Sequence, residues 1–384
     1  MLNQFSSLVT FIREVFGTSE FIPLHAPVFA GNERNYVLDA IDSTFVSSVG
    51  KYVDQFEAEM ARAAGTKYAV AVVNGTEALH IALRLAGVTA GDEVITQPLT
   101  FVATANAIQY LNAHHVFLDV DKLTLGLSPD ALLAFLSKHC EKNGGECRNR
   151  TTGRRVAACV PVHIFGHAVR IDEIAEICRD WNLALIEDAA EAIGSSFKNK
   201  PMGGFGLLGT FSFNGNKTIT CGGGGAIVTN DETLAKLGKH LTTTAKVPHK
   251  WEYAHDYTGY NYRLPNLNAA LACAQLEQLS NFIRNKRDLA ALYREHLQGS
   301  QALEFIDEPS NSKSNFWLNA VCLPDLESRN AFLDYTNSRG VMTRPCWQLM
   351  NRLPMYKSAF TGDLPNCEWL EARIVNIPSS FRPL

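Results

Sequence analysis

Between residues 67 and 189, short runs rich in β-branched residues alternate with segments in which apolar residues recur at helical spacing. The runs predicted to be strands are KYAVAVV (67–73), EVITQ (93–97), HVFLDV (115–120), RVAACVPVHIF (155–165) and LALIEDA (183–189). Repeated strand and helix units of this kind predict an α/β fold with a mostly parallel sheet covered on both faces. Because ligands bind beyond the carboxyl ends of such strands, functional residues are expected in the loops that follow them.

The strand and helix alternation ends near the glycine run from Gly222 to Gly225, and long helices are predicted over 231–244 and 266–298. A strand, a helix and proline-marked loops follow, which favours a smaller α+β domain at the C-terminus. The polar segment 141–155 is predicted to be a solvated loop or hairpin. The expected divisions are an N-terminal helix (1–22), a large domain (23–280) and a small C-terminal domain (281–384).

The composition limits the classes of partner. The 384 residues are 46% hydrophobic, and the formal net charge is -4, which is typical of a soluble globular protein and predicts neither nucleic acid nor a membrane as partner. The first residues form an amphipathic helical pattern that contains Arg13 and Glu14, so neither a signal peptide nor a membrane span is expected. Nine cysteines without C-x-x-C spacing indicate reduced thiols in a cytoplasmic protein and no metal site.

Two charged features stand out between residues 183 and 231. The acidic pair Glu187 and Asp188 ends a predicted strand, where an unpaired buried carboxylate is costly, although a helix N-cap is an alternative role. Lys217 lies in SFNGNKTI between apolar runs. A buried lysine there has a lowered pKa, as Schiff-base chemistry requires, whereas the alternative is a surface lysine in an Asn-Gly turn.

Two further features follow earlier strands. Asn74-Gly75-Thr76 ends one predicted strand and opens a helix, which makes an anion site from free N–H groups, although Thr76 could be a simple N-cap. Phe101 follows the next strand, and its alternative role is that of a core residue. A strand-end acid, a lysine, an aromatic platform and a phosphate site are together the groups that hold pyridoxal 5'-phosphate (PLP).

These residues lie in blocks that resemble the DegT/StrS family of sugar aminotransferases from about Pro23 to Ser380. The blocks, in order, are NGTEALHIAL, PLTFVATANAI, VPVHIFGH, IEDAAEAIG, FSFNGNKTITCGGGGAIVTND and GYNYRLPNLNAALACAQL. The resemblance implies the type I PLP-dependent transferase fold of aspartate aminotransferase, with a mostly parallel seven-stranded sheet in the large domain. It also implies PLP or its amine form (PMP) as cofactor.

The resemblance assigns roles to individual residues. Lys217 would form the Schiff base with PLP, Asp188 would bond the pyridine nitrogen, and Ser212 would bind the phosphate. Further contacts would come from Gly75, Thr76 and the backbone of Glu77 at the phosphate, and from Phe101 stacked on the ring. Asn261 resembles the asparagine that reaches the phosphate of the neighbouring subunit's cofactor, which implies a homodimer with shared active sites.

Glu191 departs from the commonest family pattern, in which Gln or His lies near the phenolic oxygen of the cofactor. A carboxylate there repels a phenolate unless it is protonated or bridged. Glutamate at this position resembles members that form 4-amino sugars of the perosamine, bacillosamine or legionaminic kind.

Residues 22–57 most resemble the legionaminic acid and bacillosamine branch. The implied substrate is a UDP-linked 2-acetamido-4-keto-6-deoxyhexose, with glutamate as amino donor, in surface glycan or nonulosonic acid biosynthesis. The candidate substrate contacts are Ser48, Val49, Lys51, His163 and Arg344. His163 has a structural role as its alternative.

Two other functions fit the same family. A PLP-dependent sugar dehydratase carries histidine in place of the lysine, so Lys217 argues against it. A PLP-bearing regulatory protein is the other alternative, but no DNA-binding segment or basic helix is evident.

Overall fold

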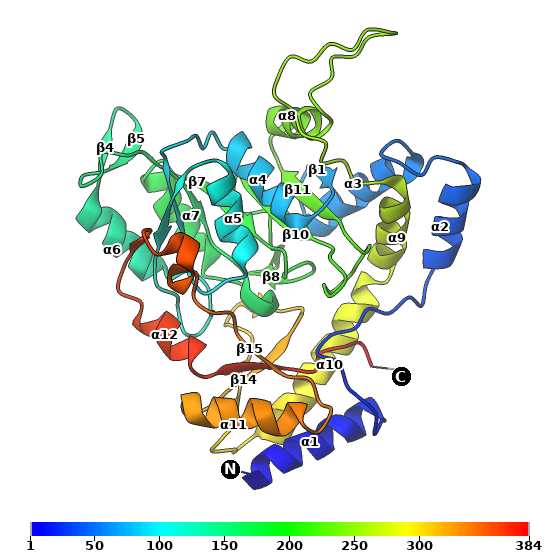
Figure 1. Cartoon of the computed structure of the whole chain (residues 1–384), viewed down its shortest axis with the longest axis vertical. Helices are drawn as coiled ribbons and strands as arrows, with labels where there is room; N and C mark the ends of the chain where they lie inside the picture. Colours follow the sequence, from blue (N-terminus) through cyan, green and yellow to red (C-terminus); the bar gives the residue numbers. More distant parts are fainter. Residues whose placement is uncertain (1, 383–384) are drawn as a thin grey trace.

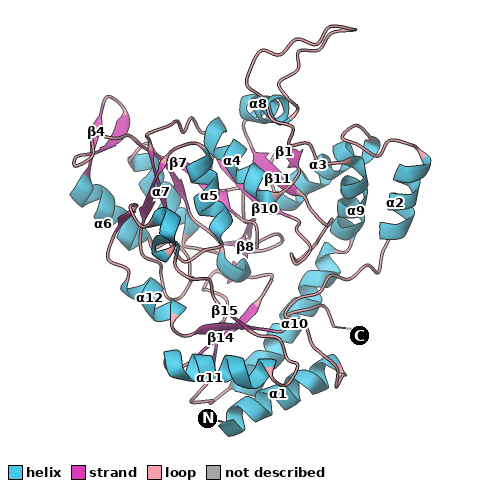
Figure 2. Cartoon of the chain, in the orientation of Figure 1, coloured by secondary structure: helices cyan, strands magenta, loops and turns pink. Residues whose placement is uncertain are grey.

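The structure, a computed structural model, describes residues 2–382 (Figure 1). Its centre is an eight-stranded sheet whose strands lie between helices (Figure 2). The strand order is β1 (Tyr68–Val72), β11 (Gly225–Thr229), β10 (Leu208–Ser212), β7 (Ala184–Asp188), β6 (Val156–Val160), β2 (Glu93–Thr96), β3 (His114–Phe117) and β16 (Phe360–Thr361).

The sheet is mostly parallel, as predicted. Strand β11 pairs antiparallel with both β1 and β10, and the other neighbouring strands run parallel. Seven strands come from the predicted large domain, and the eighth, β16, is a two-residue strand from the C-terminal segment. The small domain therefore contributes to the edge of the large sheet.

Helices cover both faces of the sheet and create two apolar cores. Alternate residues along a strand enter different cores, as Val94 and Ile95 do on β2. One core contains residues of α4 (Gly75–Leu85) and α5 (Val102–Tyr110), with α8 (Glu232–Thr242) packed against it. The other contains residues of α2 (Glu33–Asp42), α3 (Lys51–Ala64), α6 (Pro129–His139), α7 (Ile171–Asp180) and α9 (Asn266–Glu277). Burial on both faces explains why the strands are apolar runs without polar alternation.

Local sequence fixes where several helices begin. The side chains of Asn74, Ser128, Asp231 and Asp325 each accept a hydrogen bond from a backbone N–H group in the first turn of the helix that follows. The helix that follows Asn74 is α4, which therefore begins directly after strand β1. Its N-terminus is held at the carboxyl end of the sheet.

The small domain contains a four-stranded sheet in the order β12 (Glu304–Phe305), β14 (Asn319–Cys322), β17 (Ile374–Ile377) and β15 (Arg344–Pro345). Its helices are α10 (Leu279–Leu297), α11 (Leu326–Asn337) and α12 (Pro365–Glu371). The N-terminal helix α1 (Leu2–Phe16) packs on α11, where the rings of Phe5 and Phe332 are 5.1 Å apart (Figure 1). The two ends of the sequence therefore share one core.

Two sequence predictions are refined by the structure. The single helix predicted over 266–298 is wrong, because α9 and α10 are separate helices joined at Gln278. The segment 141–155 contains the predicted hairpin, formed by β4 (Cys140–Asn143) and β5 (Glu146–Asn149).

The remaining elements are short, and the thiols are unpaired. A three-stranded sheet is formed by β13 (Ser312–Lys313), β8 (Ser196–Phe197) and β9 (Lys200–Pro201), and 3₁₀ turns span Ile164–Gly166, Met350–Arg352 and Pro354–Tyr356. All nine cysteines are buried and free. Within residues 2–382, no helix has the length and apolar character needed to cross a membrane.

Candidate active site

A cavity of about 440 Å³ lies where strands β1, β7 and β10 end. Of the residues predicted to bind the cofactor, seven line it: Gly75, Thr76, Phe101, Asp188, Glu191, Ser212 and Lys217. Trp317 and Trp347 from the C-terminal segment complete its wall. The loops that follow neighbouring strands thus bring distant sequence blocks together at one edge of the sheet.

Asp188, the last residue of β7, is a buried carboxylate with fixed hydrogen-bond partners. Its Oδ2 accepts a hydrogen bond from Thr104 Oγ1 at 2.7 Å, and its Oδ1 accepts one from the Ala190 N–H at 3.2 Å. Burial raises the pKa of Asp188, while the Thr104 hydroxyl opposes that rise. A cationic partner in the cavity would stabilise the ionised form, and a protonated pyridine nitrogen is such a partner.

Glu187, the other member of the acidic pair, has a structural role. Its carboxylate is buried and accepts hydrogen bonds from the N–H groups of Gly203, Phe205 and Gly206 at 2.6–2.8 Å. Those contacts hold the loop that leads into β10. The two adjacent carboxylates therefore differ in function because successive side chains of a strand point to opposite faces.

Lys217 and Glu191 form the charged pair of the cavity. Lys217 Nζ lies 3.4 Å from Glu191 Oε1, and Glu191 Oε2 accepts a hydrogen bond from the Phe165 N–H at 2.8 Å. Burial raises the pKa of Glu191 to about 7, against the opposing effect of the Lys217 charge. Near neutral pH this carboxyl can hold or release a proton. In its protonated form it would not repel the phenolic oxygen of the cofactor.

The N-terminus of α4 and strand β10 approach each other closely enough to form a phosphate cradle. A Cβ atom on Gly75 would lie 2.7 Å from the Cβ of Ser212, so only glycine fits without movement. Thr76 and the Ser212 hydroxyl border the same space. The N–H of Glu77 already donates to Asn74 Oδ1 at 3.0 Å, so the Glu77 backbone has a partner other than the predicted phosphate.

Aromatic side chains wall the opening of the cavity. Phe101 directly precedes α5, is 53% exposed, and its ring is 6.5 Å from that of Trp347. The Trp347 ring is also 5.4 Å from that of Phe165. Phe101 is thus not a core residue, and its ring is available at the cavity for stacking.

The sequence predicts that His163 contacts the substrate, but the position of His163 does not support this role. His163 is fully buried and does not line the cavity. The Val169 N–H approaches its Nδ1 at 3.4 Å, so Nε2 carries the proton and donates to Glu187 at 3.2 Å. His163 acts as the structural histidine that the sequence left as an alternative.

The other predicted contacts lie outside the cavity of this chain. Val49 is 68% exposed beside Ser48, and Lys51 pairs with Asp39 at 2.8 Å at the start of α3. Arg344 lies on β15 and bonds Thr343 and Asn337 within the small domain.

Asn261, whose predicted role is at the neighbouring subunit's cofactor, is an exposed residue. A long arm between α8 and α9 projects from the body (Figure 1). Asn261 forms a β-bridge with Thr243, the residue after α8, and so lies at the base of this arm. Its side-chain oxygen accepts hydrogen bonds from Arg263. Asn261 does not border this cavity, and its role across subunits stays a prediction.

Sequence reasoning missed three contributors to the site. Thr104 lies one helical turn after Phe101, so its place on the same helix face could have been found from spacing. Trp317 and Trp347 are far along the chain in the C-terminal domain, and no local pattern connects them with the strand-end loops.

The chain is similar to known proteins over nearly its whole length. GDP-perosamine synthase of Escherichia coli O157:H7 is 36% identical over 360 residues, which cover 94% of this chain and 93% of that protein. GDP-perosamine synthase of Vibrio cholerae is 37% identical over 366 residues, with 93% and 94% covered. The crystal structure of the aminotransferase TlmJ from Streptoalloteichus hindustanus has a TM-score of 0.85 and 27% identity, covering 94% of this chain and 93% of that one.

The chain resembles the aminotransferase TlmJ over nearly its whole length and contains the strand-end cavity. Together these findings place it in the class of PLP-dependent aminotransferases of type I fold. The chain belongs to the DegT/DnrJ/EryC1/StrS aminotransferase family, which matches residues 28–382, and is a sugar aminotransferase with PLP as cofactor. The family predicted from the sequence is confirmed. Both relatives are named for GDP-perosamine, so the legionaminic acid and bacillosamine branch is not supported by them.

Proposed function

We propose that this enzyme converts a nucleotide-linked 4-keto-6-deoxy sugar to its 4-amino sugar, with glutamate as amino donor, in surface glycan biosynthesis. The observation that carries the proposal is the strand-end cavity in which Asp188, Glu191 and Lys217 lie together beside the Gly75 and Ser212 cradle. The buried free cysteines support a cytoplasmic location.

The residues present fit PLP. The lack of a side chain at Gly75 lets the start of α4 lie close to the Ser212 hydroxyl at the edge of the cavity, and Thr76 adds a second hydroxyl. Phe101 offers a ring face, and Asp188 offers a buried acceptor for the ring nitrogen. When bound, PLP supplies a carbonyl carbon that condenses with amines and a ring that accepts electrons.

In the proposed mechanism Lys217 has two tasks. Its amine would hold PLP in the resting enzyme, and as a free amine it would carry the proton to and from the donor's α-carbon. Asp188, whose carboxylate is fixed by Thr104 and Ala190, would hold a proton on the ring nitrogen. Glu191 shares or releases a proton near Lys217, since its raised pKa lies near neutrality.

Two substrates are the candidates within this proposal. Residues 22–57 favour a UDP-linked 2-acetamido-4-keto-6-deoxyhexose, whereas the names of the two relatives favour a GDP-linked 4-keto-6-deoxy sugar. Both carry the reacting carbonyl at C4 of a 6-deoxyhexose and differ at C2 and in the nucleotide. We retain the UDP-linked sugar as the sequence-based candidate and the GDP-linked sugar as its competitor.

A sugar dehydratase with the same fold is the second function to consider. GDP-4-keto-6-deoxy-D-mannose-3-dehydratase of E. coli, with bound hydrated PLP, has a TM-score of 0.83 at 22% identity, which bears on the fold alone. Lys217 favours the aminotransferase, because it provides the amine that a dehydratase of this family replaces with histidine.

The proposed enzyme is a homodimer. Asn261, at the base of the exposed arm, would reach the phosphate in the partner's active site, and the half-buried Ser48 and the exposed Val49 would border the partner's substrate. Mixing Lys217→Ala and Asn261→Ala chains, each inactive alone, should partly restore activity because one mixed site keeps both native residues. No recovery in verified mixed dimers would contradict the shared site.

The substrate experiment incubates the PLP enzyme with glutamate and, separately, each of the two nucleotide sugars, followed by mass spectrometry. An amino sugar and 2-oxoglutarate are the expected products with at least one of them. Loss of water from the sugar without uptake of nitrogen would support the dehydratase instead. Lys217→Ala is the control, and it should neither transfer nitrogen nor develop the visible absorption band of the lysine-bound cofactor.

A further inference from the structure

Trp317 is placed directly against Lys217. The Lys217 Nζ lies 4.0 Å from the centroid of the Trp317 ring, and the same nitrogen faces Glu191 at 3.4 Å. An ammonium over an aromatic face is attracted by the ring quadrupole, most strongly by tryptophan and more so when partly desolvated. Only 13% of the Lys217 side chain is exposed, so this contact is sheltered from water.

The indole is held rigidly at this place. Its Nε1–H donates to the backbone oxygen of Asn216, the residue before Lys217, at 2.6 Å. The Trp317 N–H donates to Asn315 Oδ1 at 2.8 Å, and its carbonyl accepts from Lys286 Nζ at 3.1 Å. Each backbone and side-chain polar atom of Trp317 therefore has a partner, and the ring cannot move away from the lysine without breaking one.

The same short segment also positions Glu191. The Asn315 amide donates to the backbone oxygens of Glu191 and Ile193 at 2.8 and 2.9 Å. Between Asn315 and Trp317, the buried Phe316 adopts a φ of 46°, a left-handed conformation that is unfavourable for a bulky residue. In this backbone conformation Trp317 lines the cavity while Asn315 bonds the backbone of Glu191, so one loop of the small domain holds both partners of the lysine.

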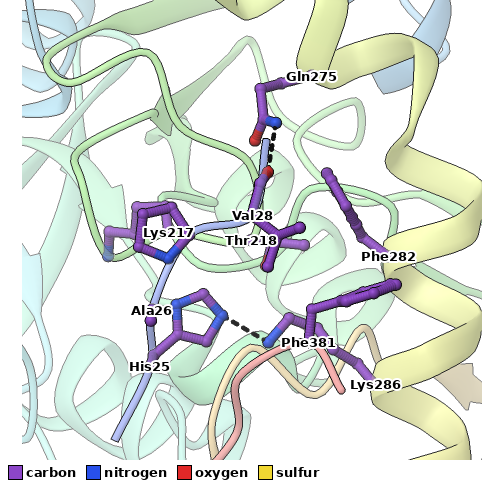
Figure 3. A pocket seen from close by; sticks show the side chains of 10 residues that line it. His25, Ala26, Val28, Lys217, Thr218, Gln275, Phe282, Lys286 and Phe381 are labelled. Atoms are coloured by element: carbon purple, nitrogen blue, oxygen red, sulfur yellow. Dashed lines mark hydrogen bonds between the residues drawn. The ribbon is translucent and has the colours of Figure 1, made fainter. Parts of the chain in front are cut away.

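A second, small cavity lies on another side of the lysine. It is lined by His25, Lys217, Thr218 and Lys286, among others, and Figure 3 shows the hydrogen bond between His25 and Lys286. Lys286 Nζ contacts His25 Nε2 at 2.8 Å and the carbonyls of Trp317 and Ser379. The buried Lys286 thus has uncharged acceptors as partners and fixes the backbone beneath the Trp317 ring.

We propose that Trp317 is a positioning residue that holds the free ε-ammonium of Lys217 beside Glu191 whenever the lysine is not bonded to the cofactor. The inference rests on the proposed role of Lys217. It gives the displaced lysine a defined resting place next to the reacting carbon, from which it returns protons without searching rotamers.

The test measures how fast the cofactor-free protein condenses with PLP as a function of pH, because only the neutral amine reacts. Loss of the aromatic face in Trp317→Leu should lower the midpoint of this profile by about 0.5 to 1.5 pH units. Trp317→Phe keeps a ring and should give a smaller decrease. The titratable groups around Lys217 are Asp188, Glu191, His25 and Lys286, and all remain in both variants.

The direction of the change separates positioning from a merely structural role. If leucine only loosened the site and admitted water, better solvation of the ammonium would raise the midpoint instead. Trp347→Leu is the matched control, since that indole lines the same cavity but contacts Phe101 and Phe165, and its midpoint should equal that of the wild type.

An unchanged or raised midpoint in Trp317→Leu would overturn the proposal. If that variant does not fold, Trp317→Phe decides, and a midpoint equal to or above the wild-type value overturns it. Lys217→Ala tests the proposed role of Lys217 separately from that of Trp317. Continued condensation with PLP in that variant would refute the proposed function itself.

Discussion

Replacing Glu191 with glutamine should change how the stability of the protein depends on pH. Burial raises the pKa of Glu191 from 4.5 to about 7 in the folded protein. The two values differ by about 2.5 pH units, so ionising this carboxyl costs about 3 kcal/mol more in the fold than in the unfolded chain. The Lys217 charge is already part of this balance, because it opposes the rise.

The sign follows from proton binding. Between about pH 4.5 and 7 the folded state retains a proton on Glu191 that the unfolded chain has released, so stability falls as pH rises through that window. Glutamine resembles the protonated carboxyl in shape and keeps an oxygen that can accept from the Phe165 N–H. Glu191→Gln should therefore match the wild type near pH 4 and exceed its unfolding free energy by up to about 3 kcal/mol near pH 8.

Urea unfolding of the cofactor-free protein at several pH values between about 4 and 8 measures this difference. Glu327→Gln, which changes an exposed carboxylate on α11, is the control and should follow the wild-type profile. If the Glu191→Gln and wild-type profiles run parallel across the window, the raised pKa is refuted, and with it the proton-sharing role of Glu191.

Two further predictions concern the cofactor groups. Asp188→Asn removes the charged acceptor for the ring nitrogen and should lower kcat by about 10- to 100-fold, as expected for one buried charge-assisted hydrogen bond. PLP should still bind, as measured by absorbance, and unchanged turnover would contradict the role of Asp188 in keeping the ring nitrogen protonated. Gly75→Ala places a Cβ 2.7 Å from that of Ser212, which should cost about 1–3 kcal/mol and weaken PLP binding in equilibrium dialysis. A native PLP Kd in that variant would contradict the cradle.

The cofactor half of the site was predictable because each of its groups belongs to a local motif. Asp188 ends an apolar strand, Gly75 and Thr76 open a helix directly after another, and Lys217 lies between strand-like runs. In a parallel sheet such positions must converge at the carboxyl edge, so the sequence pattern alone determines their proximity.

The sequence could not show how segments pack together where no regular pattern links them. The break at Gln278 has no proline or glycine to mark it, and its residues read as one continuous helix. The packing of α1 on the C-terminal domain brings Phe5 against Phe332, a contact set by tertiary structure alone. His163 follows a strand as a catalytic residue would, yet its side chain turns to Glu187 rather than into the cavity.

The difference between local motifs and tertiary packing also explains why the reaction was easier to infer from the sequence than the sugar substrate. The chemistry requires few groups, and the large domain supplies them from loops that are fixed by its sheet. The space left for substrate is walled instead by Trp317 and Trp347, which the small domain brings over the cavity. Because β16 ties that domain into the large sheet and Lys286 bonds the carbonyl of Trp317, the wall depends on how the domains pack. We therefore expect substrate choice to depend on contacts between domains, which cannot be derived from the motifs that indicate the cofactor.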